Sequence, residues 1–387
     1  MTMEMIRVQR VARRQSDPAN SYHCDGIPVF AEAELARLYG HIHSSVAFFE
    51  TSRIIYDAKT YISHENHKIS AVIIFRIEGK CAEILNEFIC LNSVEIQKFS
   101  DYIFCNFRSV HAIRFHAIQA DTGSLPYPSQ RHNSKENWVI TLPRTPTQYT
   151  DSLGKATREK IKRYSKKILK DFPSLSYEFY ENEEIQEEHI RTLIKLSQAR
   201  ITSKKKPFGI DEDETKRIIR LAKRCGVVNV ARIDGRLCAG MITYRVGFQY
   251  LTEVIAHDPN YNEYRLGTLC YHRTICESIA RGAKKFHMGG GREDYKAHLL
   301  GVRQDMDRLL IYRSYAHMAL SPCLVAKTAA DGCVRRMKVW LLAHEKSLVT
   351  QAVYSFLFLL RKLRLWLIAL SPLQSAYEAA GWVGALA

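Results

Sequence analysis

The sequence predicts an α/β fold of two modules in tandem, each a mixed, mostly antiparallel sheet flanked by helices, with a C-terminal helical extension. A chain of 387 residues is longer than one typical hydrophobic core and suits two domains. The second half shows helices, then three antiparallel strands, and then helix, strand, helix and strand. The first half shows a weaker version of the same order. We therefore expect modules over residues 1–148 and 149–315 and an extension over 316–387.

The second module carries the clearest element signals. Strands are expected over residues 227–233 and 237–244, joined by Asp234-Gly235, a dipeptide that favours a tight hairpin turn. A third strand over 249–256 ends at Asp258-Pro259-Asn260, and Gly282 ends the helix that follows. The remaining expected elements are helices over 152–170, 184–199, 213–224 and 266–281, and strands over 285–288 and 308–313.

The first module repeats part of this order. Glu78-Gly79-Lys80 separates two apolar runs, 69–77 and 81–89, which predicts a hairpin. The other expected elements are a helix over 32–49, a helix over 93–108, a strand over 112–118 and a loop over 121–130.

The charge indicates an anionic partner. The formal net charge is +16, although 46% hydrophobic and 25% charged residues are ordinary for a folded globular protein and exclude disorder as the main state. Residues 151–170 hold eight Lys and Arg against Asp151 and Glu159, and residues 302–364 hold eleven against four Asp and Glu. A solvated face is the alternative interpretation of such runs.

Localisation is expected to be cytoplasmic, with a peripheral position at the inner face of the membrane as an extension of that expectation. The start of the chain has no apolar signal region, and none of the ten cysteines forms a C-x-x-C pair, which favours reduced thiols. Residues 349–370 are apolar but interrupted by Arg361, Lys362 and Arg364, which predicts an amphipathic helix. This helix either packs on the protein itself or lies on an anionic membrane.

An ordered set of segments between Tyr149 and Arg313 resembles a known family. The segments are LGKATREKIKRYSKK, VARIDGRLCAGMITYR, DPNYNEYRLGTLCYHRTICESIARGAKKFHMGGG and EDYKAHLLG. Together they resemble the BioF2-like acetyltransferase domain of the GNAT superfamily, which also occurs in CelD-type polysaccharide-biosynthesis proteins. The architecture is similar to that of the Fem-type aminoacyltransferases, which pair two GNAT modules. The resemblance implies an acyltransferase that uses a coenzyme A thioester as co-substrate.

A turn at the start of a helix is the expected coenzyme A site. A helix N-terminus offers free N–H groups and the positive end of the helix dipole to a pyrophosphate. The segment Arg265-Leu266-Gly267-Thr268 stands at such a start, and Gly267 lets the backbone approach the ligand. It keeps one glycine of the GNAT phosphate turn and has Leu269 where the last would fall. We expect cofactor contacts at Arg265, Leu266, Gly267 and Thr268, and at Ile255 on the preceding strand.

The first module lacks an equivalent turn, because Leu91-Asn92-Ser93 stands at the corresponding place. The cofactor cleft is therefore expected in the second module only.

Three residues are candidates for proton transfer. Glu253 lies in Thr-Glu-Val, 14 residues before Gly267, and this resembles the position of the general base in GNAT histone acetyltransferases. An alkylamine is mostly ammonium at neutral pH, so a base is needed to make it nucleophilic. Tyr295 matches the GNAT tyrosine that protonates the departing thiolate. His287 stands where BioF2-like domains have Asp, which makes it a rival base or a structural histidine.

Acceptor contacts are expected beside Tyr295, at Gly290, Glu293 and Lys296. No metal is expected: His41-Ile-His43 and His64-x-x-His67 have ligand-like spacing, but no Cys or carboxylate completes either set. Nucleophile-elbow, Walker A and dinucleotide-binding motifs do not occur, which argues against hydrolases, NTPases and dehydrogenases.

Three functions stay open at this point. The first is N- or O-acyl transfer from an acyl-CoA to an amine or hydroxyl, for example in polysaccharide or cell-envelope biosynthesis. The second is Fem-type transfer from an aminoacyl-tRNA. The third is a non-catalytic basic module that binds nucleic acid or an anionic membrane, for which salt-sensitive binding is the diagnostic.

Overall fold

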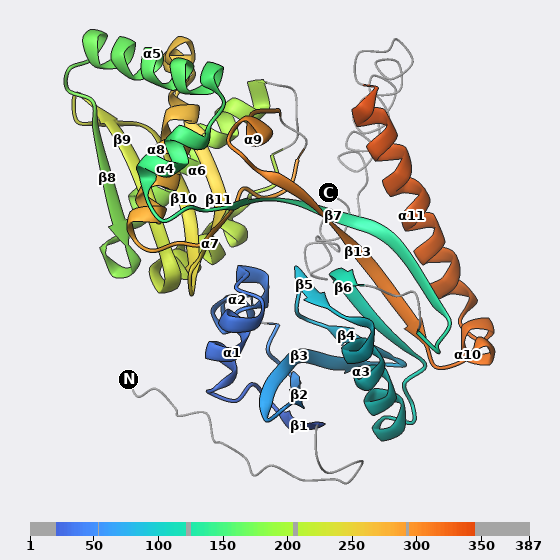
Figure 1. The fold of residues 1–387 in the computed structure, drawn as a ribbon. Helices are drawn as coiled ribbons and strands as arrows, with labels where there is room; N and C mark the ends of the chain where they lie inside the picture. The colour runs from blue at the N-terminus through green and yellow to red at the C-terminus, as the bar shows by residue number, and fades with distance from the viewer. Residues whose placement is uncertain (1–20, 53, 121–124, 204–207, 292–293, 345–387) are drawn as a thin grey trace, which may run out of the picture. The chain divides into compact units, whose positions relative to one another are not determined.

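The computed structural model describes residues 21–52, 54–120, 125–203, 208–291 and 294–344. The chain forms two compact units, residues 1–325 and residues 326–387. All thirteen strands of the described residues lie in the first unit and form one mixed, mostly antiparallel sheet (Figure 1). The sequence-predicted fold class is confirmed.

The strands differ in length but follow one path through the sheet, β1-β2-β3-β4-β6-β13-β7-β12-β11-β10-β9-β8, with β5 paired to β6. Their bounds are β1 Ser21–Asp25, β2 Lys59–Glu65, β3 Lys68–Glu78, β4 Cys81–Ile84, β5 Ile89–Leu91, β6 Ala112–Ala120, β7 Ser129–Thr141, β8 Ser176–Glu181, β9 Gly226–Ile233, β10 Arg236–Val246, β11 Gln249–His257, β12 Lys285–His287 and β13 Val302–Tyr312.

The helices that lie wholly in the first unit flank this sheet, and one more helix extends into the second unit. Their bounds are α1 Ala31–Leu38, α2 Val46–Thr51, α3 Ser93–Asn106, α4 Pro146–Ser152, α5 Lys155–Asp171, α6 Glu187–Ser203, α7 Glu212–Cys225, α8 Leu266–Ala280, α9 Asp294–His298, α10 Tyr315–Ala319 and α11 Pro322–Ala343, with 3-10 turns η1 Ile42–Ser44, η2 Asn182–Glu184 and η3 Pro259–Tyr264.

Two long strands join the halves of the sheet. The antiparallel partners of β13 are β6 and β7, and β7 also pairs with β12 (Figure 1). The expected modules therefore share one sheet where two separate sheets were expected, because the last strand of the second half is inserted between two strands of the first half. Strands that precede residue 148 pair with strands that follow it, so both halves belong to one continuous sheet. The division into modules at residue 148 stays a prediction.

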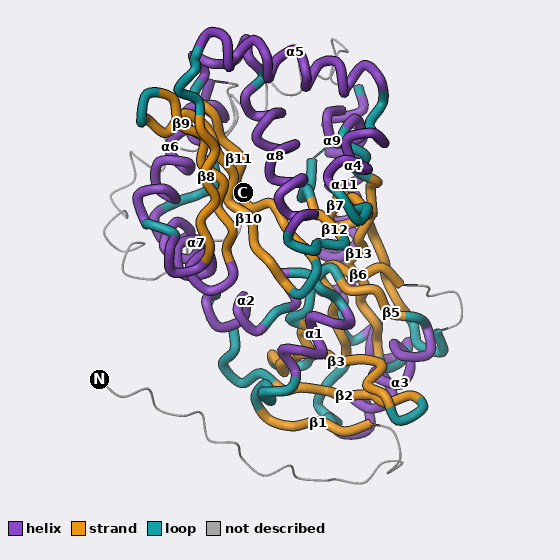
Figure 2. The backbone as a smooth tube through the Cα atoms, turned by 60° about the vertical axis from the view of Figure 1, so that its left-hand side comes forward, coloured by secondary structure: helices purple, strands orange, loops and turns teal. Residues whose placement is uncertain are grey.

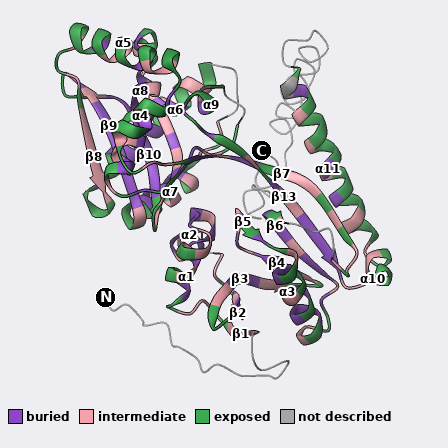
Figure 3. Ribbon diagram, viewed as in Figure 1, coloured by how far each residue is buried: buried purple, intermediate pink, exposed green. Residues whose placement is uncertain are grey.

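Two apolar layers cover the second half of the sheet. On one face, α5 and α8 pack on β9–β11 through residues such as Ile161, Tyr271 and Ile275. On the other face, α6 and α7 pack through Leu193, Ile218 and Val254. Figure 2 shows the strands between these two layers, and Figure 3 shows how much of α5 stays exposed. With both faces covered, β9 is buried at seven of its eight residues, and β10 is buried throughout its middle.

The first half has a similar pair of layers. One core lies between α3 and strands β2–β6 and includes Tyr61, Phe75 and Phe99. The opposite face of β3 packs on α1 and α2 through Leu35 and Phe49. Phe48 of α2, the neighbour of Phe49, packs against the α6–α7 core of the second half.

Several expected elements are divided in the structure. The helix expected over 32–49 breaks into α1, η1 and α2 at Gly40, whose φ is +60°. The helix expected over 152–170 is α5, which begins after Gly154 and is preceded by the separate helix α4. The strand expected over 81–89 is divided into β4 and β5. The sequence analysis missed β7 because residues 129–135 are polar and only the end of the strand is buried.

The second unit begins within α11. No helix among the described residues has the length and apolar character to span a membrane. The amphipathic helix expected over residues 349–370 lies outside the described residues.

Candidate active site

The candidate site is an opening in the edge of β11. The parallel pairing of β11 with β12 covers only three residues of each strand and ends at Leu251 opposite His287. Beyond this point β12 stops, whereas β11 continues from Thr252 to His257. The second part of β11 therefore pairs with β10 on one side only.

A β-bulge at Glu253 decides which backbone groups face this opening. The register changes from Thr243 opposite Thr252 to Ile242 opposite Val254, which leaves Glu253 as the extra residue. Before the bulge, Phe248 accepts a hydrogen bond from Lys285, so the even-numbered residues of β11 face β12. After the bulge, Asp258 donates to Cys238 on β10, so the even-numbered residues now face β10. The N–H and C=O groups of Ile255 and His257 consequently point towards the opening.

The turn before α8 lies at the far end of the opening. Arg265 has left-handed backbone angles, with φ at +52°, and its carbonyl accepts from Thr268 and Leu269. Leu266 and Gly267 are the first residues of α8, where backbone N–H groups have no partner within the helix. A side chain at Gly267 would place its Cβ 2.9 Å from Nδ1 of His257, so glycine lets α8 start directly against the end of β11.

The helix α5 is rich in basic residues and meets this turn at one point. Hydrogen bonds from Arg163 and Arg265 lower the pKa of the Tyr164 hydroxyl, which places the Arg265 side chain at α5. Lys160, Lys162, Arg163 and Lys166 are exposed on the same helix. The turn thus combines helix N–H groups with positive charge, and its residues fit the pyrophosphate of coenzyme A.

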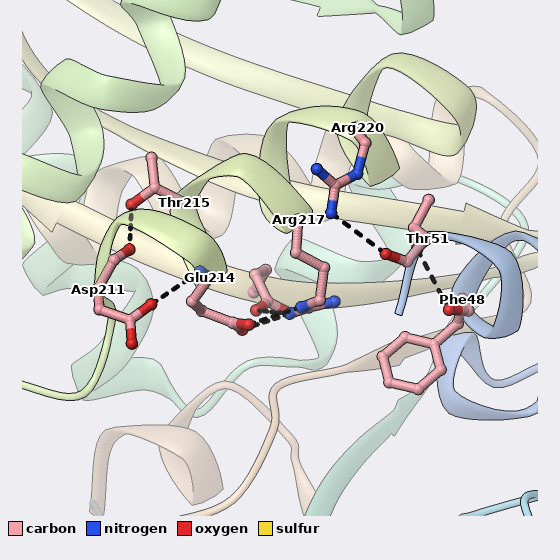
Figure 4. A network of polar contacts seen from close by, with 8 residues as sticks. Phe48, Thr51, Asp211, Glu214, Thr215, Arg217 and Arg220 are labelled. Carbon is pink, nitrogen blue, oxygen red and sulfur yellow. Dashed lines mark hydrogen bonds and ion pairs between the residues drawn. The ribbon is translucent and has the colours of Figure 1, made fainter. Parts of the chain in front are cut away.

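Glu253 points to the α7 face of the sheet and is held there by an arginine. Its Oε1 lies 3.0 Å from Nη2 of Arg217, and Arg217 also forms a two-point ion pair with Glu214. The ring of Phe48 lies 5.4 Å from the Arg217 guanidinium (Figure 4). Two polar atoms of this cluster, Arg217 Nη1 and the hydroxyl of Tyr244, are buried without a hydrogen-bond partner among the described residues.

The environment of Glu253 has opposing effects on its protonation. Burial raises the pKa of the Glu253 carboxyl, and the nearby Arg217 opposes the rise without cancelling it. A raised pKa brings a carboxylate closer to the range in which it removes a proton from an amine at neutral pH.

Tyr295 lies on the opposite, α8 face. Its ring packs against Tyr271 with the centroids 5.6 Å apart, and the Tyr271 hydroxyl lies 3.5 Å from Oγ1 of Thr252. Thr252 is the neighbour of Glu253. The fold therefore brings Glu253 and Tyr295 to the same stretch of β11 from opposite faces.

His287 is part of a buried polar chain. Its Nδ1 lies 2.8 Å from Asn137 Nδ2 and its Nε2 lies 2.8 Å from Gln249 Oε1, so Nδ1 accepts and Nε2–H donates. Burial lowers the pKa of His287 to about 3, which keeps the ring neutral. Because both ring nitrogens are engaged, His287 fits a structural role that joins β7, β12 and β11.

The three acceptor candidates have different positions. Lys296 is buried and donates to the carbonyl groups of Gly289 and Gly290, so it stabilises the glycine turn after β12. A Cβ at Gly290 would lie 3.1 Å from the Glu136 carbonyl. Glu293 lies outside the described residues.

Arg217 belongs to the candidate site but was not expected there from the sequence. The available signal was the spacing of Arg217, Arg220 and Arg224, which places three arginines on one face of α7. This face meets α2: Arg220 donates to the Thr51 carbonyl, and Arg224 pairs with Glu50. In the described part of the chain, no group of three or more His, Cys, Asp or Glu residues is arranged to hold a metal ion.

Comparison with known families identifies the class. Residues 155–297 match the family described as an acetyltransferase (GNAT) domain, which spans the segment from α5 to α9. This segment of the chain is a GNAT acetyltransferase domain, and the protein is an acyltransferase. Among curated protein sequences, none matches this chain.

Solved structures with low sequence identity are similar to this chain. FemX has a TM-score of 0.50 at 8% identity, over 68% of this chain and 90% of that chain. L-PGS from Bacillus licheniformis has a TM-score of 0.47 at 12% identity, over 79% and 98%. A tandem GNAT protein from the clavulanic acid biosynthesis pathway has a TM-score of 0.35 at 10% identity, over 75% and 98%.

Proposed function

We propose that this protein transfers an acyl group from a coenzyme A thioester directly to an amine or hydroxyl. The observation that carries the proposal is the open edge of β11, which runs from the bulge at Glu253 to the turn at Arg265. A coenzyme A molecule has a matching layout, with a thioester at one end, two amides in its arm and a pyrophosphate at the other end.

The coenzyme A thioester would lie along this edge. The arm would bond through its amides to backbone groups of β11 beyond the bulge, such as the Ile255 N–H, as an added strand does. The pyrophosphate would lie against Leu266 and Gly267 at the start of α8, beside Arg265. The thioester then lies at Glu253.

In the reaction the acceptor nitrogen or oxygen attacks the carbonyl carbon and the C–S bond breaks. Glu253 takes the proton of the acceptor on the α7 face, and the Tyr295 hydroxyl gives a proton to the departing sulfur on the α8 face. The two groups lie on opposite faces, so nucleophile and leaving group need not compete for the same space.

Acetyl-CoA binding by calorimetry and thiol release from a panel of acyl-CoAs would test this proposal together. We expect saturable binding and acceptor-dependent thiol release. The absence of both would contradict it.

A second candidate donor is an aminoacyl-tRNA. It is favoured by the exposed lysines and arginines of α5 and by the fold similarity to FemX, because the Fem-type resemblance implies this donor. An exposed basic helix suits a phosphate backbone, and binding through it weakens as salt rises. Salt-sensitive tRNA binding that acetyl-CoA does not displace, without thiol release, would favour this candidate.

The cellular setting is part of the proposal. We propose a cytoplasmic enzyme, peripheral to the inner face of the membrane, that acts on a cell-envelope or polysaccharide acceptor. The positive net charge of +16 supports an anionic surface as a contact. Binding to vesicles with and without anionic lipid would test the membrane contact.

A further inference from the structure

Arg200 lies at the open edge of β11 and takes no part in the reaction outlined above. It comes from the last turn of α6 and its Nη2 donates to the Ile255 carbonyl over 3.4 Å. The bulge turns this carbonyl towards the opening. The Arg200 guanidinium therefore borders the site at a point two residues beyond Glu253.

The other donors of Arg200 are poorly satisfied. Its Nε is buried and has no hydrogen-bond partner among the described residues. No carboxylate of the described residues forms an ion pair with it, whereas Arg217 on the neighbouring helix pairs with two. An arginine keeps its charge in such a place, and a half-buried guanidinium is stabilised by an anion.

The position of Arg200 indicates which substrate would supply that anion. Ser197 and Leu193 lie one and two turns earlier on α6 and are buried on its sheet side, so Arg200 approaches the sheet from the α6–α7 face. Glu253 points to the same face. The donor phosphates are assigned to the start of α8 on the opposite face, so the Arg200 anion is not one of them.

We infer that Arg200 recognises an anionic group, a carboxylate or a phosphate, on the acyl acceptor. This inference rests on the proposed function and adds the acceptor class: an amine or hydroxyl compound that also carries a negative charge. Arginine suits both anions because its N–H groups match two oxygens at once.

Matched acceptors test the inference. Glucosamine 6-phosphate is compared with glucosamine, and lysine with lysine amide, using acetyl-CoA as donor and thiol release as the signal. The wild-type protein should prefer the anionic member of at least one pair. Arg200→Gln should lower kcat/KM for that member about 10- to 100-fold, the loss expected for a hydrogen bond to a charged group. It should leave the neutral member unchanged.

Lys195→Gln is the control, because it removes the same charge from an exposed position on the same helix. It should leave the preference intact, and Arg200→Lys should retain part of it. Equal use of anionic and neutral acceptors by the wild type, or an unchanged preference in Arg200→Gln, would overturn the inference while thiol release upholds the proposed function. Failure of the wild type to bind acetyl-CoA would instead refute the proposed function, and the inference with it.

Discussion

At the scale of single residues, the proposed chemistry depends on two proton-transferring groups on opposite faces of the sheet, the Glu253 carboxyl and the Tyr295 hydroxyl. Glu253 is the extra residue of a bulge and is buried against Arg217. Burial favours its neutral form, and the arginine favours its charged form. In the proposed mechanism the pair therefore sets the lower pH limit at which Glu253 accepts a proton.

Glu253→Gln tests the base. We expect a loss of about 10²–10⁴-fold in kcat, the usual contribution of a positioned proton acceptor. Wild-type activity should fall as the pH drops through the raised pKa of Glu253, because only the carboxylate accepts a proton, and the substitution should remove this acid limb. pH–rate profiles provide the measurement.

Two variants serve as controls for this assignment. Glu214→Gln keeps the contact between Arg217 and Glu253 and should retain most of the activity. An acid limb that disappears in His287→Asn and persists in Glu253→Gln would transfer the role to the histidine.

Tyr295→Phe tests the acid. The phenyl ring preserves the packing on Tyr271 but has no proton to give to the departing sulfur. We expect kcat to fall while the Kd for acetyl-CoA, measured by calorimetry, stays within about twofold. An unchanged kcat under conditions in which chemistry limits the rate would remove Tyr295 from the mechanism.

At the scale of elements, the start of α8 is fixed against the end of β11 by one glycine. Because a Cβ at position 267 would press on the His257 ring, the substitution affects both packing and the approach of a ligand to the turn.

Gly267→Ala should weaken acetyl-CoA binding about tenfold and lower the melting temperature by a few degrees, as the loss of about 1 kcal/mol implies. Gly154→Ala is a matched control, since a Cβ there meets nothing within 4 Å. Wild-type binding in Gly267→Ala would exclude Leu266–Thr268 from the cofactor site.

His287, which is buried and joins β7, β12 and β11, should make the stability of the fold depend on pH. His287 titrates at about 3 in the fold, well below the ordinary value of 6.5, so below pH 6.5 the unfolded chain binds a proton that the native state does not. Stability from this group is complete above pH 6.5 and should decrease by about 1–2 kcal/mol between pH 6.5 and 5. Urea unfolding at several pH values should show a shallower dependence in His287→Asn than in His67→Asn, which alters an exposed histidine.

At the scale of the whole molecule, the two halves are not independent. Both partners of β13 and one partner of β12 belong to residues 1–148. A separate fragment of residues 149–315 would leave β13 without a neighbour, and an unpaired strand does not retain its structure in water.

We therefore expect fragment 149–315 to show no cooperative thermal transition alone and to regain one when fragment 1–148 is added. Fragment 1–325 is the control, because it keeps all thirteen strands of the first compact unit and should unfold cooperatively. A cooperative transition of 149–315 by itself would show that this half folds without β6 and β7.

The sequence by itself determined the class of the fold and most elements of the second half. Asp234-Gly235 gives the β9–β10 hairpin, and the apolar runs around it give strands, because these signals are local. Glu253, Gly267 and Tyr295 could be predicted as candidate site residues because each is tied to a short segment of characteristic spacing.

Only the tertiary structure decided the joining of the halves and the arrangement of the site. The insertion of β13 between β6 and β7 depends on strand pairing across more than 160 residues, and the polar residues 129–135 gave no local sign of β7. The contact of Arg217 with Glu253 and that of Arg200 with Ile255 join elements far apart in the chain. The chemical type of a side chain is known from its own position in the sequence. Its burial and its contacts, however, are set by the packing of elements that lie far apart in the chain.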